Sequence, residues 1–293
     1  MRLLWSQTIP PPLRGLSLAR ECETILTWDG QDSLFLFNHA GRIQAQRPSP
    51  APILAACCAE DGSAYAVACG GTGVSPVGAP VVCWLAPDLG PCWQRPLRQR
   101  ATALALEPLG QRLAVADAGG TVTVMDARGR TLWQATTLRP LHHLAFVPEK
   151  PLLVGAADFG LVLCFGASGE CLWRDGLVAH VGSLAVSGDG SSVLLACFSD
   201  GLARYSTVGP EHQRIPLESA CPLAALSYDG DCLLTADRRN RLCLRDSKGG
   251  LRDQINLDAP AVAAALGAMG DYTVVGLASG ALLRFDERAG SVD

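Results

Sequence analysis

Residues 100–136 read RATALALEPLGQRLAVADAGGTVTVMDARGRTLWQAT, and this stretch decides the fold. It holds four short runs rich in aliphatic and β-branched residues, namely ATALALE, RLAVAD, TVTVMD and RTLWQ. Turn-forming residues such as Gly, Pro and Asp separate the runs. Runs of this length and composition, bounded by turn residues, indicate four successive β-strands joined by short turns.

The same order of segments returns about every forty residues. One glycine marks the turn after the third run of each repeat, at Gly41, Gly90, Gly129, Gly169, Gly209, Gly249 and Gly290. A fixed period near roughly 40 residues, with several short apolar runs per repeat, is typical of β-propeller blades, which are four-stranded sheets arranged around a channel. Seven glycines therefore predict seven blades.

The two ends of the chain complete each other. The last repeat contains AVAAALG, YTVVGLA and ALLRFDERAG but no fourth run, and the first residues, RLLWSQTI, repeat the LeuTrp pair of RTLWQ. We predict that the N-terminal strand pairs with the C-terminal blade, because ring closure removes unpaired sheet edges. The predicted fold is all-β: a seven-bladed β-propeller of four-stranded antiparallel blades that forms one domain over residues 1–293.

Residues at fixed places in the repeat predict turns and contacts between blades. The turn before the third strand holds Gly120, Gly160, Gly201, Asn240 and Gly280. These residue types adopt positive φ at low cost, so we expect tight turns there. The fourth strands carry Trp5, Trp93, Trp133 and Trp173. We predict that these rings pack between adjacent blades, as recurring residues of repeat proteins do, and that they bind no ligand.

A family resemblance rests on the segment MDARGRTLW (125–133), with FGASGECLW and APDLGPCW as weaker copies. It resembles the DxxTGxxxW stretch of quinoprotein-type, or PQQ-like, propeller repeats, and the wider repeat is similar to WD40-like repeats. The third strands lack the TrpAsp ending of WD40 repeats. Quinoprotein dehydrogenases have eight blades, a calcium site and a periplasmic signal, which this sequence lacks. The resemblance therefore implies the repeat architecture, and we expect no cofactor.

Composition and charge narrow the classes of function. The formal net charge is −4 and the pI is near 5.7, which disfavours a nucleic-acid partner. No apolar run approaches the roughly 20 residues that span a bilayer. The first residues, MRLLWSQTIPPP, lack the long apolar core that a signal peptide has. The twelve cysteines include no CxxC pair, so we expect reduced structural thiols without bound metal. We expect a cytoplasmic protein.

Catalytic motifs are scarce. The sequence contains no GxSxG, P-loop or HExxH motif. We therefore predict a non-enzymatic interaction module or scaffold subunit that presents a face of loops to a protein partner. The alternative is an enzyme with its active site at the funnel-shaped mouth of the central channel. That site would use His142, His143 or the turn aspartates Asp117, Asp158 and Asp237.

Arginines and one insertion predict the binding face. Repeat two is longer than the others because of the segment GGTGVSPVGAP (70–80) between its second and third strands. Insertions on one face of a repeat fold often mark its binding side, although loops also lengthen without functional consequence. Arginines fall on the connections between blades. Arginines in these positions favour a protein partner with an acidic surface. The alternative is that they are solvated surface residues without a binding role. The predicted partner-binding residues are Arg47, Arg98, Arg100, Arg139, Arg238, Arg239, His143, His180 and Trp28, the last expected in an exposed turn.

Overall fold

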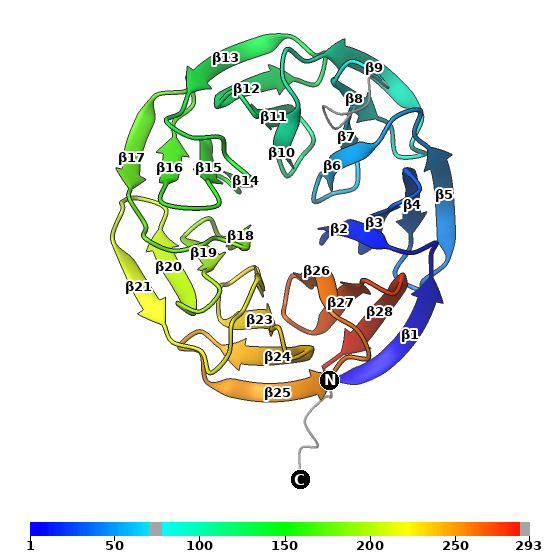
Figure 1. Cartoon of the computed structure of the whole chain (residues 1–293), viewed down its shortest axis with the longest axis vertical. Helices are drawn as coiled ribbons and strands as arrows, with labels where there is room; N and C mark the ends of the chain where they lie inside the picture. The colour runs from blue at the N-terminus through cyan, green and yellow to red at the C-terminus, as the bar shows by residue number, and fades with distance from the viewer. Residues whose placement is uncertain (71–77, 288–293) are drawn as a thin grey trace.

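Seven four-stranded antiparallel sheets form a closed ring around a central channel (Figure 1). The structure, a computed structural model, describes residues 1–70 and 78–287. Within these residues it contains 28 β-strands and no helix, so none of it forms a helix able to cross a membrane. The prediction of a seven-bladed all-β propeller is confirmed. Residues 71–77 of the predicted 70–80 insertion lie outside the described part.

The blades follow one another along the chain, and each runs from the channel outward. Blade 1 is β2 (Leu13–Ala19), β3 (Thr24–Asp29), β4 (Ser33–Phe37) and β5 (Ile43–Pro48). Blade 2 is β6 (Ile53–Cys58), β7 (Tyr65–Cys69), β8 (Val81–Leu85) and β9 (Pro91–Pro96). Blade 3 is β10 (Ala101–Leu106), β11 (Arg112–Asp117), β12 (Thr121–Asp126) and β13 (Thr131–Thr136). Blade 4 is β14 (His143–Val147), β15 (Leu152–Ala156), β16 (Val162–Phe165) and β17 (Cys171–Asp175).

The remaining blades keep this order. Blade 5 is β18 (Ser183–Val186), β19 (Ser192–Ala196), β20 (Leu202–Ser206) and β21 (His212–Ile215). Blade 6 is β22 (Leu223–Leu226), β23 (Cys232–Ala236), β24 (Arg241–Asp246) and β25 (Leu251–Asn256). Blade 7 is β26 (Ala261–Leu266), β27 (Tyr272–Leu277), β28 (Ala281–Asp286) and, from the other end of the chain, β1 (Arg2–Thr8).

The pairing of β1 with β28 closes the ring. The two strands are antiparallel, with Arg2 opposite Asp286 and Thr8 opposite Ala281. The amino group of Met1 also forms an ion pair with the carboxylate of Asp253 in blade 6. The predicted closure by the N-terminal strand is therefore confirmed.

The core lies between the blades. All five residues of β19 are buried, because a strand in the middle of a blade packs against sheets on both sides. Outer strands such as β13 alternate between exposed and half-buried residues, since one of their faces meets solvent. The apolar clusters cross blade boundaries: Val154 of blade 4 and Leu195 of blade 5 belong to one cluster. Each blade is thus stabilised mainly by its two neighbours.

The periodic tryptophans pack between neighbouring blades, as predicted. Trp5 of blade 7 lies against Gly41 of blade 1, and its indole Nε1 donates to the carbonyl of His39 at 2.9 Å. Trp93 donates in the same way to Ala127 of the next blade, also at 2.9 Å. A side chain in place of these turn glycines would strike the indole. The repeated pair of glycine and tryptophan is therefore a contact between blades.

The loops divide into two faces. We call loop face the side formed by the turns between second and third strands and by the connections from each blade to the next. All five turn residues predicted to have positive φ do so, from 59° at Asn240 to 90° at Gly280. The turns between first and second strands form the opposite face.

The loop face is not uniform around the ring. In blades 1, 2, 3 and 7 the first residue of the first strand already pairs with the second strand, and a bulge follows this pair. In blades 4, 5 and 6 the first strand has four or five residues and no bulge. The residues before β18 and β22 make only one isolated bridge each. The ring is consequently less regular on this side.

Candidate functional site

A cavity of about 730 Å³ opens on the loop face where blades 4, 5 and 6 meet. Its lining includes His143, Asp158, His180, Phe198, Ser199 and Arg238, and we call this set the blade 5 pocket. Three of the predicted partner-binding residues, His143, His180 and Arg238, therefore come together although they belong to different repeats. The pocket lies on the irregular part of the ring.

Isolated bridges shape the pocket. Phe159 pairs with His180, and Phe198 pairs with Cys221, each in a single antiparallel bridge. The connection before β18 thereby approaches the next connection closely. A β-carbon at Gly182 would lie 2.3 Å from the carbonyl oxygen of Pro222. Only glycine permits this approach, because it has no β-carbon. The close contact at Gly182 therefore forms one wall of the pocket.

The turns between the second and third strands of blades 4 and 5 contain aromatic residues and lack the aspartate found in blades 3 and 6. In blades 3 and 6, Asp117 and Asp237 accept hydrogen bonds at 2.9 Å from backbone N–H groups of their own turns. In blades 4 and 5, Ala157 and Cys197 occupy the corresponding place, and Phe159 and Phe198 sit within the turns. Phe198 has a φ of 48°, a region that costs a residue with a side chain on the order of 1 kcal/mol.

Arg238 supplies the positive charge of the pocket. Its guanidinium carbon lies 5.1 Å from the centroid of the Phe198 ring, and its backbone N–H donates to Ala220 at 3.1 Å. Neighbouring Arg241 is neutralised by Asp237, with 2.7 Å between Nε and Oδ2. By contrast, no ion pair or side-chain hydrogen bond of Arg238 occurs within the described residues. Stacking therefore orients a cation whose charge is not compensated.

His143 lies at the inner wall. Its Nε2 is 3.2 Å from the carbonyl oxygen of Val181, and this contact makes Nε2 the protonated nitrogen of the neutral ring. Burial lowers the pKa of His143 below its ordinary value, against the opposing effects of the Val181 carbonyl and of Asp158. The neutral ring consequently offers Nδ1 as an acceptor.

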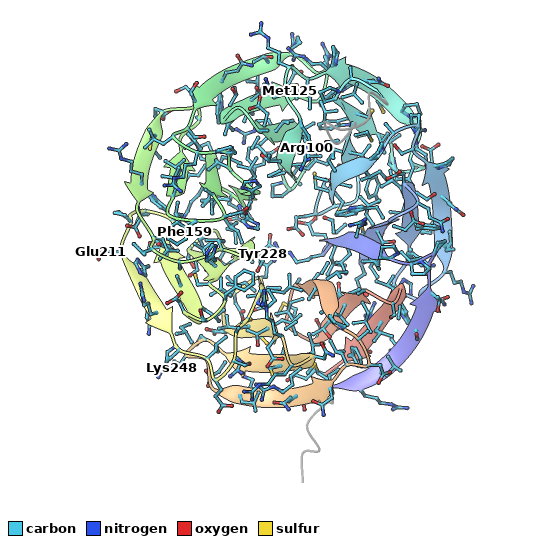
Figure 2. All side chains as sticks on the ribbon, viewed as in Figure 1. Arg100, Met125, Phe159, Glu211, Tyr228 and Lys248 are labelled. Carbon is cyan, nitrogen blue, oxygen red and sulfur yellow. The ribbon has the colours of Figure 1, made fainter. Side chains whose placement is uncertain are left out.

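The outer edge of the pocket has a polar part and an apolar part. Nδ1 of His142 lies 3.3 Å from Oδ1 of Asp158, and both side chains are exposed. The rings of Phe159 and His180 have their centroids 5.0 Å apart. Val178, in the same connection as His180, is 73% exposed. We call Phe159 and Val178, one paired with His180 and the other two residues before it in the chain, the apolar rim. Phe159 is labelled in Figure 2.

Three predicted arginines lie elsewhere on the loop face. Arg98 and Arg100 belong to the β9–β10 connection and Arg139 to the β13–β14 connection, and all three are exposed. Within residues 1–70 and 78–287, none of their side chains forms an ion pair or a hydrogen bond. Figure 2 shows Arg100 next to the first strand of blade 3. They form a basic stretch along the connections from blade 2 to blade 4 and line no part of the pocket.

Two predicted binding residues, Arg47 and Trp28, lie in strands and make contacts within the ring. Arg47 lies in β5, and its Nη1 donates at 3.1 Å to the carbonyl of Leu89 in blade 2. It is a contact between blades, because side chains of the twisted outer strand reach the next blade. The expectation that Trp28 sits in an exposed turn is wrong. Trp28 lies in β3 opposite Leu34, and its ring occupies the space above Gly15, where a β-carbon would lie 2.2 Å away.

Arg239 differs from Arg238 although the two are adjacent. Both are exposed, but Arg239 does not line the pocket, and its backbone N–H donates to Asp237 at 2.9 Å. Phe159 and Phe198 are site residues that the sequence reasoning missed. The available signal was a phenylalanine in this turn of repeats four and five, where repeats one, three and six have an aspartate that accepts backbone hydrogen bonds. That signal requires comparison of the repeats with one another at a single turn.

Three residues of the enzyme alternative, His142, His143 and Asp158, lie together at the blade 5 pocket and the channel mouth, and the other two do not join them. Asp117 and Asp237 serve their own turns, and Asp158 faces His142. No hydroxyl or thiol donates to a histidine ring in the part of the chain that the structure describes. An activated nucleophile needs such a pair within hydrogen-bonding distance.

The channel does not suit the quinone of the quinoprotein enzymes. Its wall consists largely of Leu and Ala side chains, such as Leu104, Ala185 and Ala225. Arg20 is the cation at its far end. It already binds Glu60, with 2.9 Å between Nε and Oε2, and lies 5.4 Å from the centre of the Tyr228 ring (Figure 2). The described residues also contain no cluster of three His, Cys, Asp or Glu side chains that could hold calcium. We therefore derive no chemistry through this cofactor.

Comparison with known proteins agrees with the architecture. A family model described as outer membrane protein assembly factor BamB matches residues 118–280, and no curated protein matches the chain. The matched part runs from the second turn of blade 3 to the corresponding turn of blade 7 and includes the whole blade 5 pocket. It covers more than half of the 293 residues. This chain therefore belongs to the PQQ-like β-propeller repeat family of the assembly factor BamB.

Proposed function

We propose that the chain is a non-enzymatic interaction module that binds a protein partner through its loop face. The blade 5 pocket carries this proposal, because it combines an oriented cation, aromatic rings and an exposed apolar rim. Aromatic and Arg side chains around a pocket are the usual anchors of protein interfaces. The description of the family model as an assembly factor supports a role in bringing proteins together.

The proposed partner has an acidic surface. Arg98, Arg100 and Arg139 are exposed on the loop face without bound carboxylates, within the described residues. The opposite face bears acidic turn residues such as Glu149, Asp189 and Asp229. The loop face also carries carboxylates, such as Glu218 and Asp258 in the connections after blades 5 and 6, so the three arginines define a basic arc from blade 2 to blade 4. A basic arc steers an acidic partner during encounter and fixes its orientation. The net charge of −4 supports a protein partner over nucleic acid.

We further propose a cytoplasmic location. All twelve cysteines are free, and seven of them are buried. Burial raises the pKa of Cys57 to about 12 and that of Cys197 to about 11, which keeps these thiols protonated and unreactive. Free thiols in this number suit a reducing compartment. Fractionation of native cells, with alkylation of thiols at lysis, tests this location.

A pair of variants tests the proposed face. Val178→Glu places a charge in the rim of the pocket, and Val208→Glu places the same charge in the turn between β20 and β21. The two valines are 73% and 82% exposed, so neither variant should change the melting temperature by more than a few degrees. Immobilised Val178→Glu should fail to retain the protein that wild type captures from a native extract, whereas Val208→Glu should retain it. Equal capture by all three proteins would refute the loop face as the binding surface.

A further inference from the structure

The blade 5 pocket has the polar groups of a peptide site. Arg238 donates from a fixed direction because its guanidinium lies over Phe198, 5.1 Å from the ring centroid. His143 also lines the pocket, and because its Nε2 is bound to Val181, Nδ1 is left as an acceptor. A carboxylate satisfies the donor and a backbone N–H satisfies the acceptor. A short peptide segment offers both kinds of group.

Arg238 can bind one carboxylate. It is the single permanent cation among the lining residues of the pocket that the structure describes. Asp158, the carboxylate in that lining, lies 3.3 Å from His142 and not on Arg238. A phosphate carries about two negative charges and only acceptor oxygens near neutral pH, so it would leave one charge unmatched and meet the acceptor of His143 unfavourably. A planar guanidinium binds a carboxylate through two parallel hydrogen bonds.

The rim adds an apolar requirement. Phe159, which is 38% exposed, pairs with His180 of the lining, and Val178, two residues before His180 in the same connection, is 73% exposed. An apolar side chain next to the bound carboxylate would cover this rim and remove it from water.

We propose that the blade 5 pocket binds a short linear segment of the partner protein in which an Asp or Glu stands near an aromatic or aliphatic residue. Arg238 binds the carboxylate, Phe198 orients Arg238, and the rim of Phe159 and Val178 binds the apolar residue. This assignment rests on the proposed function, because it names the chemistry of the partner at that face. It makes Arg238 the residue that determines specificity.

A peptide selection tests the assignment. A random heptapeptide library displayed on phage is selected against the full-length wild-type protein, and the enriched peptides are synthesised and measured by fluorescence anisotropy. Enriched sequences should contain an acidic residue beside an apolar one. Because hydrogen bonds to charged groups are strong, Arg238→Met should weaken binding roughly 10-fold or more, and Arg238→Lys should restore only part of it. Arg239→Met, with the same change in the same turn, should stay within about twofold.

The outcomes separate the two proposals. Enriched peptides without acidic residues, no enrichment at all, or equal losses in Arg238→Met and Arg239→Met would overturn the assignment. If apolar peptides are enriched and Val178→Glu abolishes their binding, the assignment fails while the proposed face stands. If acidic peptides bind Val178→Glu and Arg238→Met as tightly as wild type, the face itself is wrong.

Discussion

The guanidinium of Arg238 lies over the ring of Phe198, 5.1 Å from its centroid, across the boundary between blades 5 and 6. Phe198 adopts a φ of 48° in the turn that holds it there. The strained turn thus holds the ring on which the guanidinium of Arg238 lies. No other blade of the described ring repeats this combination. We regard this pair as the centre of the proposed interaction site.

The first prediction concerns the basic stretch on the loop face. The double substitution Arg98→Glu and Arg100→Glu should weaken partner capture, most visibly at low ionic strength, because exposed charges act mainly by steering that salt screens. The melting temperature should change little. Glu149→Arg and Asp229→Arg on the opposite face serve as controls. Capture that survives the first change and is lost with the controls would show that the partner binds the other face.

The second prediction concerns the wall of the pocket. Gly182→Ala should lower the free energy of unfolding by about 1–3 kcal/mol, because the added carbon would lie 2.3 Å from the carbonyl oxygen of Pro222. The matched control is Gly176→Ala, since nothing lies within 4 Å of a β-carbon there. That variant should stay within about 0.5 kcal/mol of wild type. Urea unfolding measures both, and equal effects would contradict the close approach at Gly182.

The third prediction concerns ring closure. Deletion of residues 1–9 removes β1, exposes the edge of β28 and leaves apolar surface of blades 7 and 1 uncovered. Soluble yield should fall sharply, and the melting temperature of any soluble product should drop. Thermal stability equal to that of the intact chain would contradict the structural role of β1.

The fourth prediction concerns pH. Because burial lowers the pKa of His143, the unfolded chain binds its proton more readily than the folded protein does. The free energy of unfolding should therefore decrease as pH falls through about 6.5, the ordinary pKa of histidine, and continue to fall until the folded-state pKa is passed. His143→Gln keeps a donor for Val181 but does not titrate. Urea titrations at several pH values should show a shallower dependence for His143→Gln, and parallel curves would refute the buried neutral histidine.

The fifth prediction concerns thiols. Cys22, Cys92 and Cys171 are exposed, so a thiol reagent should label them rapidly in the folded protein. The buried cysteines, such as Cys164 with a pKa raised to about 12 by burial, should react only after denaturation. Peptide mapping of labelled protein distinguishes the two groups. Rapid native labelling of Cys164 would show that the space between blades opens readily.

The sequence predicted the ring but only part of the site. Strand order, turn glycines and the tryptophan contacts depend on neighbours in the chain or on the same place in the next repeat, so a single period reveals them. The pocket instead joins a histidine of blade 4, an aromatic turn of blade 5 and Arg238 of blade 6. Arg47 and Trp28 were misplaced because each sits one or two residues inside a strand that was expected to have ended.

Closure by β1 also determines when the ring can be completed. Arg2 pairs with Asp286, so β1 has no partner until β28 has been synthesised. Pairing between segments this distant in the chain is slow, because a long loop must close before any contact compensates for its entropy. Blades 1 to 6 are contiguous segments that can pair as they are synthesised, whereas blade 7 needs strands from both ends of the chain. During that interval Leu3, Leu4 and Trp5 remain without their sheet, and a chaperone acting on this protein would find its target there.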